Sequence, residues 1–219
     1  YILPKVEASL RVLKDQELAG KTIQSYAEAL RGFCRWCVKR SYLDEDPLAE
    51  LRSFDTTPRS KRRALTVMEI GKLLGATPTH RRILYEVALT TGLRAGELRS
   101  LSTRSLDIQK NTLNLKAAWT KNRRPGLLHL HASIVNELVE LNRSGTVPAL
   151  YAMHYSRKDA RPLGIPESPL LFVPTHTARD LKKDLKTAGI EYKKPGEGKV
   201  DFHSLRVTFV TLVYESGAS

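Results

Sequence analysis

Apolar residues recur at helical spacing in the first part of the chain. From Ile23 to Val38 they fall at every third or fourth position and cover one helix face roughly 140° wide. Thr22, directly before this run, is a residue type that favours the helix N-cap. The pattern therefore predicts an amphipathic helix that begins after Thr22 and buries its apolar face.

Further helices are predicted from their end signals. Thr66 and Glu69 have capping-box spacing ahead of an apolar run that reaches Leu74. Gly92 follows another run, and glycine is common directly after a helix because it adopts the left-handed conformation. The helices expected from these signals cover 81–91, a short segment from about 95, 132–142, 177–188 and 204–216.

Two segments, 112–118 and 126–131, have strand character. The basic turn Lys121-Asn122-Arg123-Arg124-Pro125 lies between them, which predicts a hairpin. Residues 144–170 contain four prolines and are expected to form a long loop. Together these elements predict a mainly α fold with a small β-sheet, of the α+β class.

A polar, proline-containing and basic stretch at 53–63 predicts a linker between a helical domain, 1–58, and a second domain, 64–219. The 219 residues carry a net charge of +13. Residues 1–58 contain nine basic and nine acidic side chains, so the whole excess lies in 59–219. Such an excess favours a polyanionic partner, most simply nucleic acid, over a merely solvated basic surface.

Four basic residues, Lys21, Arg31, Arg35 and Lys39, line up beside the apolar face of the first predicted helix. A stripe of this kind suits a helix that lies along DNA phosphates, and it is equally typical of an ordinary solvated face.

The two cysteines, Cys34 and Cys37, have the spacing of a redox motif. A redox motif needs a preceding strand and a helix N-terminus, whereas these residues lie inside a helix on its apolar side. We expect two buried, unreactive thiols. His129 and His131 lack an evident third ligand, so no metal site is predicted. The chain has no signal-peptide pattern and no apolar run long enough to span a bilayer, which predicts an intracellular protein without membrane contact.

Three places carry residues suited to phosphate chemistry. Arg94 stands at a helix start with Glu97 three residues on, a spacing that holds a guanidinium rigidly. Lys121 lies at the tip of the basic hairpin, and His203 and Arg206 share one helix face. Taken singly, each has an ordinary alternative: a solvated Arg–Glu pair, a polar hairpin tip, or a capping histidine beside an exposed arginine.

In this order the three places resemble the tyrosine recombinases, the phage integrase family. The resemblance rests on the box Thr90-Thr91-Gly92-Leu93-Arg94-Ala95-Gly96-Glu97-Leu98, the lysine hairpin, and His203-Ser204-Leu205-Arg206. It implies a helical core-binding domain, a basic linker that crosses DNA, and a catalytic domain. One departure is Val207, where many members of the family have a second histidine.

The resemblance also implies a role for each site residue. Arg94 and Arg206 would clamp the non-bridging oxygens of the scissile phosphate, Lys121 would protonate the leaving 5′-hydroxyl, and His203 would help take the nucleophile's proton. Glu97 would support the site, and neither metal nor cofactor is required. The residues expected along the DNA backbone are Lys21, Arg31, Arg35, Lys39, Arg59, Lys61, Arg62, Arg63, Asn122, Arg123 and Arg124.

In this family a tyrosine forms a 3′-phosphotyrosyl intermediate. Tyr214 follows Arg206 too closely to be that tyrosine, so we expect the nucleophile beyond Ser219 and the chain to be a fragment. The resemblance further implies double-stranded DNA as partner, four protomers on two DNA sites, and a place in the cytoplasm with the nucleoid. A non-catalytic DNA-binding regulator and a type IB topoisomerase remain as alternatives.

Overall fold

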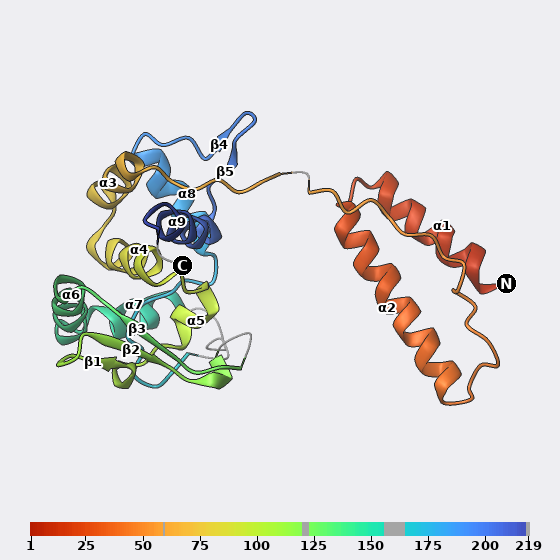
Figure 1. Ribbon diagram of the computed structural model, residues 1–219, viewed down its shortest axis with the longest axis horizontal. Coiled ribbons are helices and arrows are strands. Elements are labelled where there is room, and N and C mark those ends of the chain that lie inside the picture. Colours follow the sequence, from red (N-terminus) through yellow and green to blue (C-terminus); the bar gives the residue numbers. More distant parts are fainter. Residues whose placement is uncertain (59, 120–122, 156–164, 218–219) are drawn as a thin grey trace. The chain divides into compact units, whose positions relative to one another are not determined.

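A computed structural model describes the chain except for residues 59, 120–122, 156–164 and 218–219. The chain divides into two compact units, Tyr1–Lys61 and Arg62–Ser219 (Figure 1). Each unit has its own hydrophobic core, so each is described separately.

The first unit consists of two helices, α1 (Ile2–Asp15) and α2 (Gly20–Lys39), and the extended segment that follows them. Its buried core contains Leu10, Ile23, Ala27, Cys34, Leu48 and Leu51. Both cysteines are buried free thiols inside α2, which confirms their prediction. Burial, with Asp46 and Cys37 nearby, raises the pKa of the Cys34 thiol.

The start of α2 differs from the expectation. The helix begins at Gly20, so Thr22 lies in its first turn and is not the N-cap. The Asp55 carbonyl oxygen lies 1.8 Å from where a Cβ on residue 20 would be, so only glycine fits there. The Gln24 side chain also accepts a 2.8 Å hydrogen bond from the Phe54 N–H, and the extended segment is thereby attached to α2.

The second unit contains seven α-helices, two 3-10 turns and five short strands in its described residues. In chain order they are α3 (Val67–Ala76), α4 (Thr79–Thr91), α5 (Ala95–Ser100), η1 (Thr103–Ser105), β1 (Leu106–Asp107), β2 (Thr112–Leu115), η2 (Ala117–Trp119), β3 (Gly126–His129), α6 (Ala132–Arg143), α7 (Thr146–Tyr155), α8 (Thr177–Thr187), β4 (Lys193–Lys194), β5 (Gly198–Lys199) and α9 (Phe202–Glu215).

The sheet of the second unit is antiparallel with strand order β1-β2-β3, and it pairs Leu113 with Leu106 on one side and with Leu128 on the other. The strands β4 and β5 form a separate small hairpin. Leu73, Leu98 and Leu113 are fully buried, so α3, α5 and the larger sheet contribute to one core. The predicted class, mainly α with a small sheet, is confirmed.

Most predicted ends are confirmed, including the Thr66–Glu69 capping box and the left-handed Gly92 after α4. The loop predicted over 144–170 is wrong in part, because α7 forms within it. Pro148 is the third residue of α7, and a proline is tolerated in a first turn whose N–H groups have no partner within the helix. The strands β2 and β3 are shorter than predicted.

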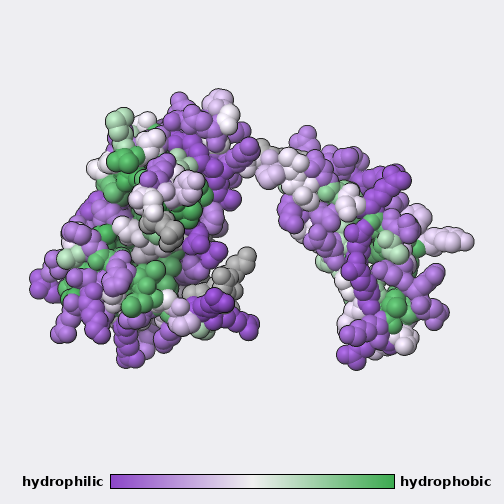
Figure 2. Space-filling model, viewed as in Figure 1, coloured by the Kyte–Doolittle hydropathy of each residue, from purple (hydrophilic) through white to green (hydrophobic). Residues whose placement is uncertain are grey.

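Hydrophilic side chains cover most of the surface in the view of Figure 2. Among the residues the structure describes, no helix is both long enough and apolar enough to cross a membrane.

Candidate active site

The turn between α4 and α5 presents Arg94. Glu97 is buried, and its Oε2 atom accepts a 2.8 Å hydrogen bond from the Arg94 N–H while its Oε1 atom lies 3.0 Å from the guanidinium. The Arg94 side chain is nevertheless 41% exposed. The guanidinium is therefore fixed from the protein side and remains open to an anion on the other side.

Helix α9 presents His203 and Arg206 in its first two turns. Phe202 and Leu205 are buried, and the Phe202 ring packs edge-on against Tyr85 of α4. With this face buried, His203 is left exposed and Arg206 partly exposed. The Arg206 guanidinium donates a hydrogen bond to the Gly92 carbonyl oxygen, which joins α9 to the turn that carries Arg94.

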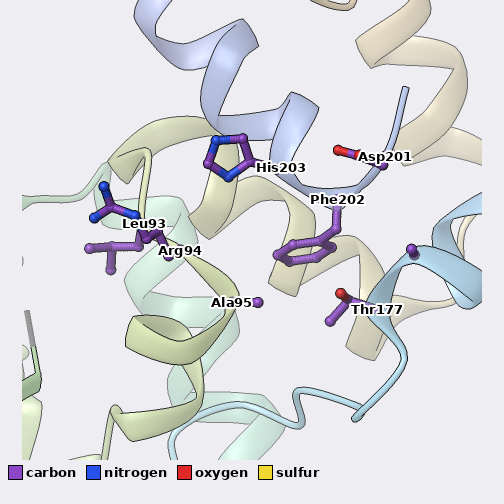
Figure 3. A pocket seen from close by; sticks show the side chains of 8 residues that line it. Leu93, Arg94, Ala95, Thr177, Asp201, Phe202 and His203 are labelled. Atoms are coloured by element: carbon purple, nitrogen blue, oxygen red, sulfur yellow. The ribbon is translucent and has the colours of Figure 1, made fainter. Parts of the chain in front are cut away.

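These elements enclose a pocket of about 240 Å³ (Figure 3). Its lining residues are Leu93, Arg94, Ala95, Thr177, Ala178, Asp201, Phe202 and His203. Both α8 and α9 begin at this pocket, at Thr177 and Phe202. Helix N-termini carry partial positive charge and free N–H groups, so their position favours an anion in addition to the arginine. Sequence reasoning missed the contribution of α8, because no local signal marks it.

The surroundings of His203 favour its neutral form. Desolvation and the positive charges of Arg62, Arg206 and Arg94 lower the pKa of the imidazole, and Asp201 opposes them. A neutral imidazole can accept a proton, which is the property a general base requires.

Arg94, His203 and Arg206, which are far apart in the sequence, thus lie in one region with Glu97 behind them. Lys121, Asn122 and Arg59 lie outside the described residues. Arg123 and Arg124 are exposed immediately after that gap, next to β3.

The predicted basic stripe lies on one continuous helix, α2. Lys21, Arg35 and Lys39 are exposed and Arg31 is partly buried. Arg35 makes a long contact, 3.9 Å, with Asp46. The stripe, together with the exposed Lys61, is available for contact with a partner.

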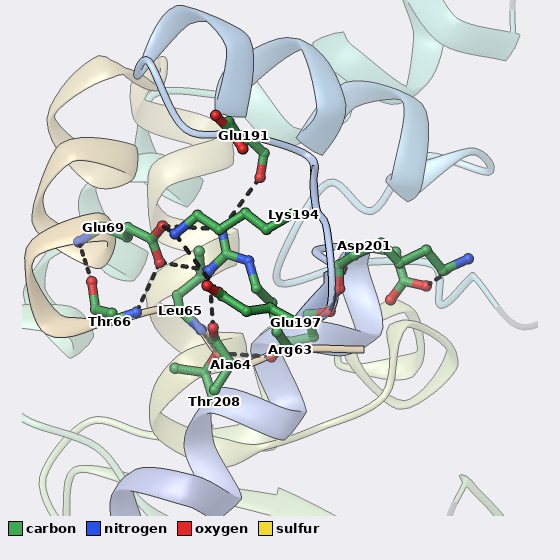
Figure 4. A network of polar contacts seen from close by, with 12 residues as sticks. Arg63, Ala64, Leu65, Thr66, Glu69, Glu191, Lys194, Glu197, Asp201 and Thr208 are labelled. Atoms are coloured by element: carbon green, nitrogen blue, oxygen red, sulfur yellow. Dashed lines mark hydrogen bonds and ion pairs between the residues drawn. The ribbon is translucent and has the colours of Figure 1, made fainter. Parts of the chain in front are cut away.

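Arg63 differs from the expected exposed linker residue, since its side chain is 7% exposed. Its guanidinium pairs with both carboxylate oxygens of Glu69, at 2.7 and 3.0 Å, and donates to the Glu191 carbonyl oxygen (Figure 4). A guanidinium held in this way is not free for DNA, so the structure does not support the predicted contact of Arg63 with the DNA backbone. Arg62 is half exposed but contacts Asp201.

No group of three or more side chains suited to a metal ion occurs in the described part of the chain. His131 caps α6 and is paired through Nδ1 with Ser133, while His129 is exposed on β3. Tyr214 is 84% exposed on α9, about 12 Å along the helix from Arg206.

The chain is similar in sequence to tyrosine recombinases. It is 26% identical over 108 residues to tyrosine recombinase XerC of Chlamydia trachomatis serovar L2, which covers 47% of this chain and 34% of that protein. It is 30% identical over 112 residues to XerC of Xanthomonas axonopodis pv. citri, covering 48% and 36%. The chain thus spans about a third of the length of the curated relatives it matches.

Solved structures share the fold. A lambda integrase dimer bound to a COC′ core site matches with a TM-score of 0.66 at 17% identity, over 98% of this chain and 57% of that one. The Tn1549 transposon integrase in complex with a circular intermediate DNA matches with a TM-score of 0.63 at 15% identity, over 99% and 74%.

The model of the phage integrase family matches residues 62–219, which is the whole second unit and the part of the chain that carries Arg94, His203 and Arg206. The chain belongs to the phage integrase family.

Proposed function

We propose that this chain is the core of a site-specific DNA recombinase that cleaves and rejoins duplex DNA through a 3′-phosphotyrosyl intermediate. The observation that carries the proposal is the convergence of Arg94, His203 and Arg206 on the region where α8 and α9 begin. A DNA-binding surface needs positive charge, but it does not need a buried Glu97 to orient one arginine beside a neutral imidazole.

The arrangement suits phosphoryl transfer. When the tyrosine oxygen attacks phosphorus and the 5′-oxygen leaves, negative charge grows on the two non-bridging oxygens. Arg94 and Arg206 are positioned to stabilise that charge, and both are held in place before the DNA arrives. His203, whose pKa is lowered by desolvation and by its cationic neighbours, accepts the proton of the attacking hydroxyl.

The remaining roles follow from the resemblance. Lys121 donates the proton that the leaving 5′-oxygen takes up, and the nucleophilic tyrosine is supplied by a residue other than Tyr214. The helical domain 1–58 and the domain 64–219 each contact duplex DNA, with Asn122, Arg123 and Arg124 along its backbone. A lambda integrase tetramer bound to a Holliday junction is among the similar structures, at 18% identity and a TM-score of 0.63 over 97% of this chain and 60% of that one. We propose four protomers on two DNA sites, acting in the cytoplasm at the nucleoid.

The test is covalent capture on a nicked suicide substrate, in which the cleaved fragment diffuses away and the protein–DNA ester accumulates. The gene product that contains this chain is expected to form an adduct at the 3′-phosphate. Arg94→Ala, Arg206→Ala and His203→Ala should each reduce the rate by at least about 100-fold, as expected for the loss of a preorganised charge or a proton-transfer group.

Absence of an adduct with retained DNA binding would favour the non-catalytic regulator. An adduct that relaxes supercoils without exchanging strands between two duplexes would favour the topoisomerase.

A further inference from the structure

The segment where the second unit begins lies along the start of α9. Arg62 and Lys199 form a β-bridge, and the Arg63 N–H donates a 3.0 Å hydrogen bond to the Lys199 carbonyl oxygen. Further along, the Leu65 N–H donates to the Thr208 hydroxyl at 2.9 Å. The segment 62–65 is therefore bound both to α9 and to the strand that leads into it (Figure 4).

The Arg62 side chain adds a contact that the backbone does not require. Its Nε atom lies 2.9 and 2.8 Å from the two carboxylate oxygens of Asp201. Asp201 is the N-cap residue of α9, and its own N–H donates to the Ser204 hydroxyl at 3.1 Å. Lys199 reaches the same carboxylate at a longer distance, 3.6 Å.

The position of Asp201 makes this contact relevant to the pocket. Asp201 lines the pocket, and its side chain is only 12% exposed. His203 follows two residues later and Arg206 five residues later. A carboxylate at this place without a counter-ion would repel a phosphate, and a displaced Asp201 would move the first turn of α9.

We propose that Arg62 is a positioning residue: by holding Asp201 it fixes the first turn of α9 and neutralises the one carboxylate among the described residues that line the phosphate pocket. The inference rests on the proposed function. Arg62 is the first residue of the second unit. Its contact with Asp201 therefore also connects the start of this unit to the helix that carries His203 and Arg206.

The first test measures the 219-residue chain without DNA. Arg62→Met keeps the aliphatic stem and removes the charge, and Arg62→Lys restores the charge alone. Arg143→Met, which removes an arginine from an exposed pair on α6, is the matched control. We expect Arg62→Met to speed amide hydrogen exchange about tenfold in the second turn of α9, whose N–H groups donate to carbonyl oxygens of the first turn; this is the effect of removing one charge-assisted hydrogen bond. Arg143→Met should leave that exchange unchanged.

His203 provides a readout that a purely structural role would not change. The charged groups that face it in the described residues are Arg62, Asp201, Arg206 and Arg94. Arg62→Met removes a positive charge, so the pKa of His203 measured by NMR titration should rise. Arg62→Lys should return it toward the wild-type value even if the exchange rates remain fast.

A double-mutant cycle assigns the effect to the pair. In the Asp201→Asn background, Arg62→Met should have no further effect on exchange in α9. Unchanged exchange and an unchanged His203 titration in Arg62→Met would overturn the proposal, as would an equal effect of Arg62→Met with and without Asp201. Neither measurement involves DNA, so the result is independent of the covalent-capture test of the recombinase.

In the gene product, Arg62→Met should move the acidic limb of the adduct-formation profile to higher pH, because a higher His203 pKa leaves less neutral imidazole. An acidic limb that stays in place, in a variant that still forms the adduct, would contradict the proposed role.

Discussion

Gly92 is the residue through which Arg206 is joined to the turn that carries Arg94. Its φ of +63° ends α4, and its carbonyl oxygen accepts the hydrogen bond from Arg206. A Cβ at this position would lie 2.4 Å from the Phe209 ring of α9. The position therefore excludes other residues through its backbone conformation and also through the packing of α9.

Gly92→Ala should lower the free energy of unfolding by about 2–4 kcal/mol, from left-handed strain and overpacking. Adduct formation by the gene product should fall with it, since α9 must shift to admit the methyl group. Gly71→Ala is the control, because a Cβ there meets no atom within 4 Å and glycine inside a helix costs about 0.5–1 kcal/mol. Urea denaturation of wild type, Gly92→Ala and Gly71→Ala measures the three stabilities. Equal stability of Gly92→Ala and wild type would contradict the prediction.

At this scale the sequence identifies residues that stand in a recognisable motif. Arg94, Glu97, His203 and Arg206 could be named because their sequence boxes, taken together and in order, resemble those of a known family. The roles of Arg62 and Arg63 could not be predicted, because a basic stretch beside a proline has the composition of an exposed linker. The partner of Arg62, Asp201, is distant in the sequence, and the partner of Arg63, Glu69, lies outside the basic stretch. Only the fold brings each pair together.

Among the elements, α3 is fixed to the β4–β5 hairpin through Glu69. Glu69 pairs with Arg63 at 2.7 Å and with Lys194 at 3.1 Å, and it accepts from the Thr66 N–H at 3.0 Å. Desolvation raises the pKa of this carboxyl, but the hydrogen bonds from Arg63, Thr66 and Lys194 outweigh it and lower the pKa from 4.5 to about 2.

Because the folded-state pKa is depressed, Glu69 stabilises the fold above its unfolded pKa, and this stability is lost as the pH falls from about 4.5 to about 2. Glu69→Gln should be less stable than wild type at neutral pH and should lose less stability across that interval. Glu140→Gln, in an exposed pair, should follow wild type. Urea denaturation at a series of pH values measures the free energy of unfolding. If this free energy fell equally with pH in Glu69→Gln and in wild type, the stabilising role of the Glu69 carboxylate would be contradicted.

Element prediction worked where end signals are local. The Thr66–Glu69 capping box and the glycine after α4 are of this kind. It failed at the start of α2, where no side-chain cap marks the helix end and where Gly20 packs closely against Asp55, a residue far away in the chain. The prediction also failed at α7. A proline breaks a helix when it lies in the interior, but Pro148 lies in the first turn of α7, where a proline is tolerated.

On the scale of the whole molecule, charge is divided unevenly. Residues 1–58 are neutral overall, and Arg59 and Lys61 give the first unit a net charge of only +2, so any attraction of this unit to DNA depends mainly on the arrangement of its charges. The exposed residues of the α2 stripe, Lys21, Arg35 and Lys39, provide such an arrangement.

Replacement of Lys21, Arg35 and Lys39 by Gln should weaken DNA binding and flatten its salt dependence. The slope of log K against log salt should fall by about 0.9 for each DNA phosphate that the variant no longer neutralises. A pair of changes on α1, Lys5→Gln with Lys14→Gln, is the control and should keep the wild-type slope. Binding isotherms at a series of salt concentrations measure the slopes. An unchanged slope in the α2 variant would mean that the stripe is an ordinary solvated face that does not contact DNA.

The role of Arg206 and Arg94 in neutralising the scissile phosphate is tested most directly by exchanging that phosphate for an uncharged methylphosphonate. On a nicked duplex carrying the recombination site, the gene product with Arg206→Ala should form little covalent adduct with the native phosphate and regain adduct formation with the methylphosphonate, because the charge that the arginine balances is then absent. Failure of the methylphosphonate to restore adduct formation in Arg206→Ala, on a substrate that the wild-type protein cleaves, would contradict this role.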